Sequence, residues 1–75
     1  MPKVPAVTGN ELIRALEKAN FETVRQRGSH VRMEHEDGRT VTVPIHSNQS
    51  IGKGLLKKIL RDVNLTVEEL IALLG

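Results

Sequence analysis

The chain of 75 residues contains no cysteine, tryptophan or tyrosine, and Phe21 is its single phenylalanine. Without cysteine, a disulfide-stapled secreted domain and a zinc site built on thiolates are both excluded. No apolar run approaches the roughly 18 residues of a membrane span, and no hydrophobic segment of the signal-peptide type follows Met1. We therefore expect a cytoplasmic protein with an almost wholly aliphatic core and no membrane partner.

The residues that are present have the composition of a small globular domain. Hydrophobic residues make up 39% and charged residues 27% of the chain, which is ordinary for a folded protein. We expect one domain over residues 1–75, with an irregular lead-in over residues 1–7 that contains two prolines. Eleven Lys and Arg residues against nine Asp and Glu give a net charge of +2 and a pI near 9.4. This charge suits a nucleic acid or an acidic protein partner, although solubility alone also explains it.

The first part of the chain has the pattern of a short helix. Thr8 and Glu11 have the spacing of a capping box, in which each side chain satisfies a free backbone N–H group of the other residue. Apolar residues then follow at helical spacing: Leu12, Ile13, Leu16 and Ala19. Asn20 tolerates the left-handed backbone that ends helices, so we expect the helix to end near it.

Three strands are predicted next. Residues 21–26 mix aromatic, β-branched and polar residues, and residues 27–29 read as a turn. Two further strands, over residues 30–36 and 39–45, flank Asp37-Gly38, a dipeptide typical of hairpins.

The alternation of apolar and polar side chains along the two strands predicts the length of the loop in that hairpin. A two-residue turn would place Val41 opposite Glu34 and mix apolar with polar side chains. A three-residue loop places Met33 opposite Val41 or Val43 and separates the two kinds, with Gly38 available for the left-handed position of a bulge. We therefore predict the three-residue loop. Its polar face then carries His30, Arg32, Glu34, Thr42 and His46, with the two histidines directly paired or one diagonal apart.

The last third of the chain predicts a loop and two helices. Residues 47–54 are rich in Ser, Asn and Gly. An amphipathic helix follows and ends at Asn64, and Thr66 and Glu69 open a short third helix. The order is helix, three antiparallel strands, helix and short helix. It predicts an α+β domain with its helices on one face of the sheet.

The corner formed by Gly28, Ser29 and His30 is the first candidate site. A histidine beside a flexible glycine and a hydroxyl group can act as an acid or base near neutral pH. RNA carries its own nucleophile, the 2′-hydroxyl, so His30 and His46 could share the two proton transfers of its cleavage. Cationic side chains could then stabilise the added charge on the phosphate: Arg27, Arg32 or Lys53. The pattern by itself favours a plain surface turn here, and a turn-capping role for His46.

The three histidines do not indicate a metal site. His30 and His35 are five residues apart on one strand, so their side chains face opposite sides of the sheet. His30 and His46 would supply two ligands without a clear third. We therefore expect neither a metal nor another cofactor.

A basic stripe marks the outer side of the second predicted helix. Lys53, Lys57 and Arg61 follow one another at intervals of four residues, and Lys58 lies beside them. The stripe begins in a glycine-containing loop, where free N–H groups at the helix start could add to phosphate binding. The solvated face of an amphipathic helix is the plainer explanation. The stripe gains functional meaning if it borders the same groove as His30.

Several segments of the chain, in this order and spacing, resemble the HicA-like (YcfA-type) toxins of bacterial and archaeal toxin–antitoxin pairs. The resemblance runs from about Thr8 to Leu74. Its carriers are the helix exit at residues 16–21, Val24-Arg25-Gln26-Arg27-Gly28-Ser29-His30, Asp37-Gly38, Val43-Pro44-Ile45-His46, residues 54–60 and Leu65-Thr66. Asn20 departs from the family pattern, in which a glycine precedes the phenylalanine, but asparagine can adopt the same backbone.

The resemblance implies a fold similar to that of double-stranded-RNA-binding domains. It also implies ribonuclease activity on mRNA with His30 as the catalytic residue, no required metal, and neutralisation by a HicB-type antitoxin. Support of catalysis by Ser29 and His46 is inferred from their positions alone. The candidate RNA-binding residues are Arg27, Arg32, Lys53, Lys57, Lys58 and Arg61.

Two other functions fit the same sequence. The domain could bind RNA through its basic surface without cleaving it, or it could be a protein-interaction domain that meets an acidic partner. The lack of aromatic residues limits base stacking in any RNA complex, so sequence preference would depend on polar contacts or on RNA shape.

Overall fold

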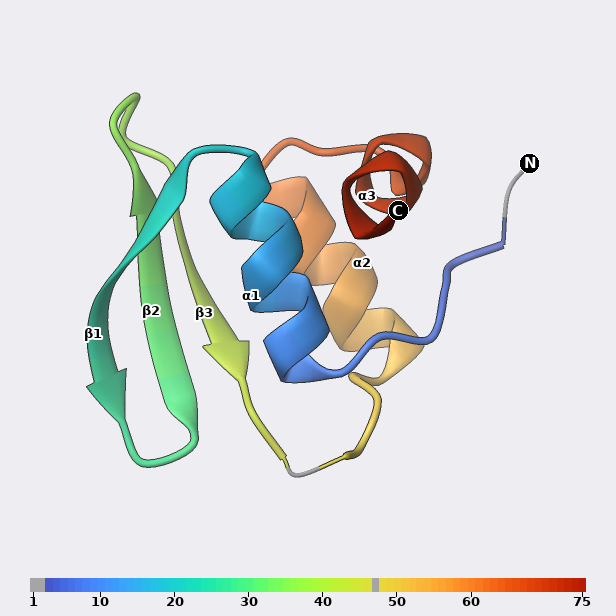
Figure 1. The fold of residues 1–75 in the computed structure, drawn as a ribbon, viewed down its shortest axis with the longest axis horizontal. Helices are drawn as coiled ribbons and strands as arrows, with labels where there is room; N and C mark the ends of the chain where they lie inside the picture. The colour runs from blue at the N-terminus through green and yellow to red at the C-terminus, as the bar shows by residue number, and fades with distance from the viewer. Residues whose placement is uncertain (1–2, 47) are drawn as a thin grey trace.

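The computed structural model describes residues 3–46 and 48–75. Within these residues, a three-stranded sheet forms one layer and three helices form the other (Figure 1). In chain order the elements are α1 (Gly9–Lys18), β1 (Phe21–Arg27), β2 (His30–His35), β3 (Thr40–Pro44), α2 (Lys53–Asp62) and α3 (Val67–Leu74). The order of elements and the helix layer on one face confirm the predicted α+β class. The arrangement is consistent with that of double-stranded-RNA-binding domains.

The lead-in to α1 is irregular but anchored. Residues 1 and 2 of the predicted lead-in, and Ser47 of the predicted loop, lie outside the described residues. Residues 3–7 contain no helix or strand, as predicted, yet Val7 is only 1% exposed. The Val7 carbonyl accepts a hydrogen bond from the N–H of Ile51 at 2.7 Å. The lead-in therefore joins the loop before α2 to the core.

Helix ends follow the predicted capping signals. The N–H of Thr8 donates to Glu11 Oε1 at 2.9 Å, and the N–H of Glu11 donates to Thr8 Oγ1 at 3.2 Å, so the capping box of α1 is confirmed. Thr66 and Glu69 form the same box at α3. Asn20 has a φ of 72° and so adopts the left-handed backbone that the family pattern assigns to a glycine.

The β2–β3 hairpin has the predicted register. Met33 lies opposite Val41, and the N–H of His35 donates to the carbonyl of Arg39 at 2.8 Å. Residues 36–38 therefore form the three-residue loop. Gly38 has a φ of 101°, which is the left-handed region that favours glycine.

A bulge at Val24 reverses the side-chain alternation of β1. Thr23 lies opposite Met33 before the bulge, and Arg25 lies opposite Arg32 after it. If the pairing of Thr23 with Met33 continued without a bulge, Arg25 would lie opposite Val31 and would face the helices. Because one inserted residue reverses the alternation, Arg25 instead shares the outer face, the face of the sheet turned away from the helices.

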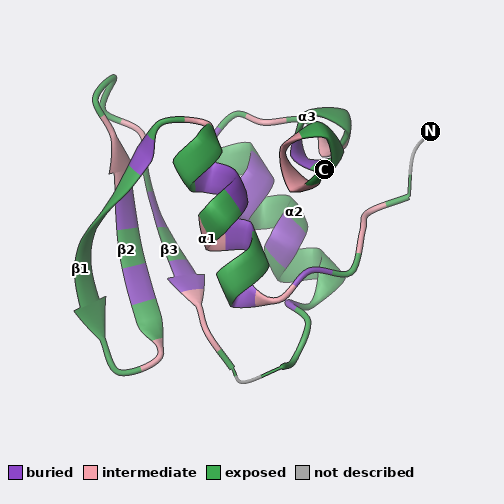
Figure 2. Cartoon of the chain, in the orientation of Figure 1, coloured by how far each residue is buried: buried purple, intermediate pink, exposed green. Residues whose placement is uncertain are grey.

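Buried residues from both layers, coloured purple in Figure 2, form one core cluster. Strands β2 and β3 contribute four of them: Val31, Met33, Val41 and Val43. Phe21 is 2% exposed, while the rest of β1 is exposed along its length. The core is thus aliphatic apart from Phe21, as predicted.

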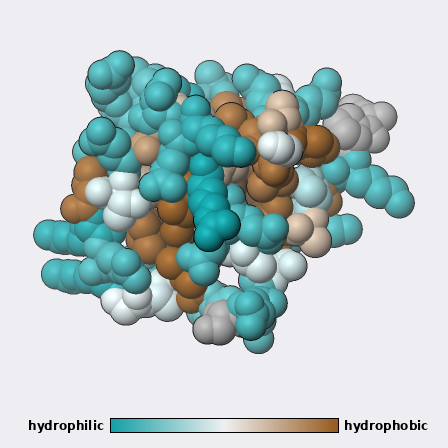
Figure 3. Space-filling model, in the orientation of Figure 1, coloured by the Kyte–Doolittle hydropathy of each residue, from teal (hydrophilic) through white to brown (hydrophobic). Residues whose placement is uncertain are grey.

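The C-terminal helix closes one side of the helix layer. Leu70 is fully buried, and Lys18 Nζ donates to the Leu73 carbonyl at 3.0 Å, which ties α3 to α1. Ile71 remains 43% exposed. On the side of the molecule in Figure 3, apolar patches lie around α3 and between the layers, on an otherwise largely hydrophilic surface.

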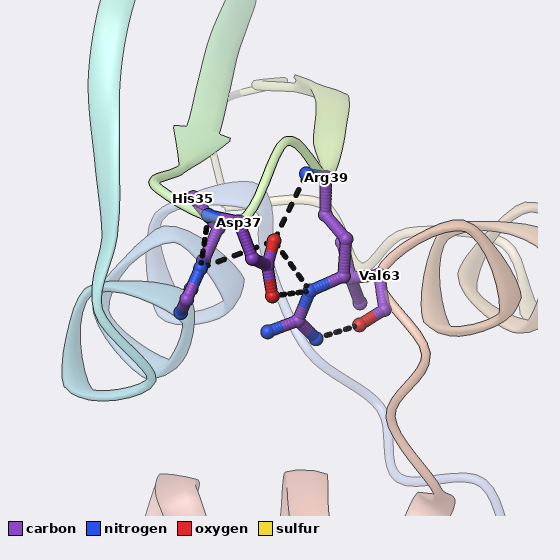
Figure 4. A network of polar contacts seen from close by, with 4 residues as sticks. All are labelled: His35, Asp37, Arg39 and Val63. Carbon is purple, nitrogen blue, oxygen red and sulfur yellow. Dashed lines mark hydrogen bonds and ion pairs between the residues drawn. The ribbon is translucent and has the colours of Figure 1, made fainter.

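A polar network fastens the β2–β3 end of the sheet to the helices (Figure 4). Asp37 accepts hydrogen bonds from the backbone N–H of Arg39 at 3.0 Å and from its Nε, and Arg39 also donates to the carbonyl of Val63. The ring of Phe21 lies 5.1 Å from the Arg39 guanidinium and 5.1 Å from the centre of the His35 ring. The backbone hydrogen bond from Arg39, followed by that of its guanidinium, lowers the pKa of the Asp37 carboxyl below its usual value.

Candidate active site at the β1–β2 corner

The predicted corner lies at the opposite end of β2 from that network. Arg27 and His30 are cross-strand partners, so Gly28 and Ser29 form a two-residue turn between them. Gly28 has a φ of 54°, and a side chain there would meet open space, so the backbone conformation and not a lack of space favours glycine. The turn therefore begins one residue later than the predicted 27–29, because Arg27 belongs to β1.

Hydrogen bonds connect this corner to its neighbours. The N–H of Ile45 donates to the Ser29 carbonyl at 2.6 Å, just beyond the end of β3. Gln26 Nε2 donates to the Gly28 carbonyl at 3.3 Å. Gly9 at the start of α1 packs against Pro44, where a Cβ would collide with the Pro44 carbonyl oxygen. The backbone that carries His30 is thus held by β1, β3 and, through Pro44, by α1.

His30 presents its side chain on the outer face. It is exposed and alternates with the buried Val31, while the exposed Arg32 follows on the same side of β2. Arg27 lies directly across from His30, and Thr42 lies across from Arg32. An imidazole flanked by guanidinium groups in open solvent can exchange protons while the cations hold an anionic substrate.

Arg25 joins this group, and our sequence reasoning missed it. It lies across from Arg32 on the outer face. The signal was present in the sequence, because Arg25 and Arg27 are two residues apart and share a face in a regular strand. What the sequence did not show was which face, since that depends on the bulge at Val24.

His46 does not pair directly with His30 across the strands, which was one of the two predicted arrangements. Pro44, and not His46, lies opposite His30, so the direct pairing of the two histidines is wrong. The remaining alternative was a diagonal separation, about 7–8 Å in a regular ladder. His46 is exposed and follows Ile45 beyond the end of β3, one residue after the hydrogen bond to Ser29.

The basic stripe of α2 belongs to the helix layer rather than to the outer face. Its four residues are all exposed: Lys53, Lys57, Lys58 and Arg61. Lys58 Nζ pairs with Asp62 at 3.0 Å in an exposed ion pair. The start of α2, at Lys53, lies at the same end of the molecule as the β1–β2 turn (Figure 1). The helix then runs away from that end, so the stripe and His30 do not share one face.

A hollow of about 480 Å³ lies away from His30, near the β2–β3 end of the sheet. Four glutamates line it together with Phe21 and His35: Glu17, Glu22, Glu34 and Glu36. Its negative charge makes it unsuitable for a phosphate. In residues 3–46 and 48–75, no group of three or more His, Asp or Glu side chains is arranged to hold a metal ion.

Fold and site together define a small basic domain that is like double-stranded-RNA-binding domains in arrangement and that presents a histidine among arginines on an open sheet face. In a comparison with known protein families, the sequence model of the family described as the HicA toxin of bacterial toxin–antitoxin systems matches residues 9–65. The match covers most of the chain, and the chain therefore belongs to the HicA toxin family. Membership in a toxin–antitoxin family implies an antitoxin partner. No curated protein matches the chain.

The described residues contain no helix with the length and hydrophobicity needed to span a membrane.

Proposed function

We propose that this HicA toxin is a metal-independent endoribonuclease that cleaves mRNA, with His30 as its catalytic residue. HicA toxins are ribonucleases as a family. The observation that carries the proposal for this chain is the exposed position of His30 on the outer face, directly across from Arg27 and next to Arg32 on that face. A base, an acid and positive charge near the phosphate are what RNA cleavage requires.

The proposed reaction uses the 2′-hydroxyl of the RNA as the nucleophile. Its oxygen attacks the adjacent phosphorus and its proton passes to a base. The bond from phosphorus to the 5′-oxygen breaks, and that oxygen receives a proton from an acid. The products are a 2′,3′-cyclic phosphate and a 5′-hydroxyl end. In our proposal His30 and His46 share the two proton transfers, and Arg27 and Arg32 stabilise the charge on the phosphate.

Two further sets of residues have supporting roles in the proposal. Ser29 supports His30 through its backbone, because its carbonyl accepts the Ile45 N–H and so fixes the corner. The α2 cations bind phosphates farther along the RNA: Lys53, Lys57, Lys58 and Arg61. Lys58 contributes least among them, since its ammonium group is already shared with Asp62.

We further propose that the antitoxin is a HicB-type protein that covers the His30 face. The cations on that face would attract an acidic surface as well as RNA. Added antitoxin should therefore abolish cleavage. An antitoxin that binds while cleavage continues would separate its binding surface from the active site.

The decisive experiment compares wild type with His30→Ala, each purified without its partner, on a defined RNA. Loss of one acid–base group should lower the cleavage rate by about 10²–10⁴-fold. The new ends should be 5′-hydroxyls, and chelation of divalent metal with EDTA should leave the rate unchanged. Equal cleavage by both proteins would contradict the role of His30, and binding of RNA without any cleavage would favour the non-catalytic alternative.

A chemically altered substrate supplies the matched control. A single 2′-deoxynucleotide at the cleavage position removes the nucleophile but leaves the phosphates and bases in place. We expect this RNA to bind wild type with unchanged affinity and to remain uncut at that position. Continued cleavage there would exclude attack by the 2′-hydroxyl.

A further inference from the structure

The register of β1 points to a substrate-binding residue beyond those proposed above. We propose that Arg25 binds the RNA phosphate next to the one that is cleaved, and that the bulge at Val24 exists in this strand to place it there. This inference rests on the proposed ribonuclease function. It assigns the open outer face, rather than the helix layer, to the RNA strand at the point of cleavage.

The cross-strand pairs on the outer face form two successive rows. Arg27 and His30 make the first row, and Arg25 and Arg32 make the second. Two residues along a strand span about 6.7 Å, which is comparable with the separation of neighbouring phosphates along a nucleic-acid strand. A phosphate at His30 therefore leaves the next one within reach of Arg25. Guanidinium groups suit this role because they bind phosphate oxygens in pairs.

The arginines of the second row are free to take a new partner. Arg32 Nε lies 3.4 Å from Glu34 Oε2, with both side chains about half exposed, so this ion pair is weak. Within the described residues Arg25 makes no ion pair, and its side chain is exposed.

The charge of the outer face changes sign farther along the strands. Beyond Arg25 and Arg32, the third outward-facing row is the pair of Glu22 and Glu34. It lies toward the end of β2 that is far from His30. Like charges in direct opposition repel each other and also repel phosphate. The positive part of the face thus extends over two rows, and an RNA strand that follows it is held at about two phosphates before it must leave the sheet.

The bulge is necessary for this arrangement. In an unbroken ladder Arg25 and Arg27 would both turn toward the helix side, and His30 would be left without a cation directly across from it. One extra residue in β1 moves both guanidinium groups to the face of His30.

The test compares Arg25→Gln with Arg14→Gln, which removes the same charge from an exposed position on α1. The substrate is a single-stranded RNA oligonucleotide that wild type cleaves. We expect Arg25→Gln to raise KM about tenfold with little change in kcat, as for a contact made equally in the ground and transition states. Arg25→Lys should fall between wild type and Arg25→Gln, and Arg14→Gln should behave as wild type.

Equilibrium binding gives a readout that does not depend on turnover. In an inactive His30→Ala background, Arg25→Gln should weaken RNA binding about tenfold. It should also reduce the slope of log affinity against log salt by about 0.7, the value for one phosphate contact on a single strand.

Equal affinities for the Arg25→Gln and Arg14→Gln proteins would overturn the role of Arg25. A larger loss of RNA affinity from Arg14→Gln than from Arg25→Gln would place the RNA on the helix layer. If Arg25→Gln weakened antitoxin binding and left RNA binding unchanged, the outer face would be a protein interface. Either result would overturn the inference. Failure of wild type to cleave any RNA would instead overturn the proposed function.

Discussion

The two ends of β2 are built differently although each carries a histidine and a glycine-containing turn. At the β2–β3 end, His35 packs against Phe21, and Arg39 links Asp37 to the end of α2. At the β1–β2 end, His30 is exposed, and the contacts that hold the corner are made by backbone groups and Gln26. One end joins the sheet to the helices, and the other leaves its polar side chains available to a ligand.

Under the proposed function, this difference separates stability from catalysis along a strand of six residues. A side chain that is buried in the core cannot also contact an RNA substrate, so the two tasks fall to different residues. The comparison predicts that substitutions at the β2–β3 end will lower stability, whereas substitutions at the β1–β2 end will lower RNA cleavage.

The largest expected effect on stability comes from Phe21→Ala. It removes the one aromatic side chain of the core together with its contacts to His35 and Arg39. We expect the free energy of unfolding to fall by about 3 kcal/mol or more, measured by urea denaturation. His30→Ala, at the other end of the sheet, should change it by no more than about 0.5 kcal/mol. Comparable destabilisation by both variants would contradict the division between the two ends.

Arg39→Gln is expected to lower the free energy of unfolding by less than Phe21→Ala does. This change removes the ion pair with Asp37, the hydrogen bond to the Val63 carbonyl and the contact with the Phe21 ring. We expect a loss of about 2 kcal/mol, because the Val63 contact is partly buried and charged. Arg27→Gln is the matched variant at the exposed end and should leave the thermal midpoint within a degree or two of wild type. A thermal melt of the three proteins checks this, and an unaffected Arg39→Gln midpoint would show that the network does not stabilise the fold.

The two turn glycines provide a pair with similar surroundings and different expected consequences for cleavage. Gly28 and Gly38 both have positive φ, and both have open space where a side chain would lie. Alanine should cost about 1 kcal/mol of stability at Gly28, whose φ of 54° lies in the left-handed helical region, and more at Gly38, whose φ of 101° lies outside it. Gly28→Ala should also reduce RNA cleavage, because it alters the backbone that carries His30, whereas Gly38→Ala should cleave at the wild-type rate. Equal rates for the two variants would mean that the corner conformation does not matter for catalysis.

The smallest effect concerns the pH dependence of stability at Asp37. Its pKa is lowered in the folded protein, chiefly by the backbone hydrogen bond from Arg39. Its contribution is therefore complete above the unfolded-state pKa of about 3.9 and is lost as the pH falls through the lower folded-state value. The thermal midpoint of wild type should exceed that of Asp37→Asn at pH 6, and the difference should shrink toward pH 2.5. A constant difference over this range would show that the carboxylate charge is not the cause.

Much of the site could be predicted from local pattern. The capping boxes at Thr8 and Thr66, the three-residue loop before Arg39 and the outward direction of His30 all follow from short-range preferences or from strict alternation. The bulge at Val24 could not be predicted in this way, since Val24 fits a regular strand as well as a bulged one. The bulge lets Phe21 enter the core at one end of β1 while Arg27 lies opposite His30 on the outer face at the other.

The position of His46 and the meaning of the basic stripe were also beyond local pattern. Strand alternation predicted that the two histidines are directly paired or one diagonal apart. The register of β2 and β3, which places Pro44 opposite His30, decided that they are not directly paired. The α2 cations were identified as exposed, yet their distance from the His30 face depends on which side of the sheet the helix packs.

The sequence alone determined the elements, the turn glycines and the polar character of the corner, because these depend on the preferences of neighbouring residues. The tertiary structure decided which side chains share a face. That outcome depends on register, and register is set by the burial of Phe21, Met33 and Val43 beneath the helices. The Gly28-Ser29-His30 corner was visible in the sequence, but Arg25 became part of its surroundings only through the packing of the core.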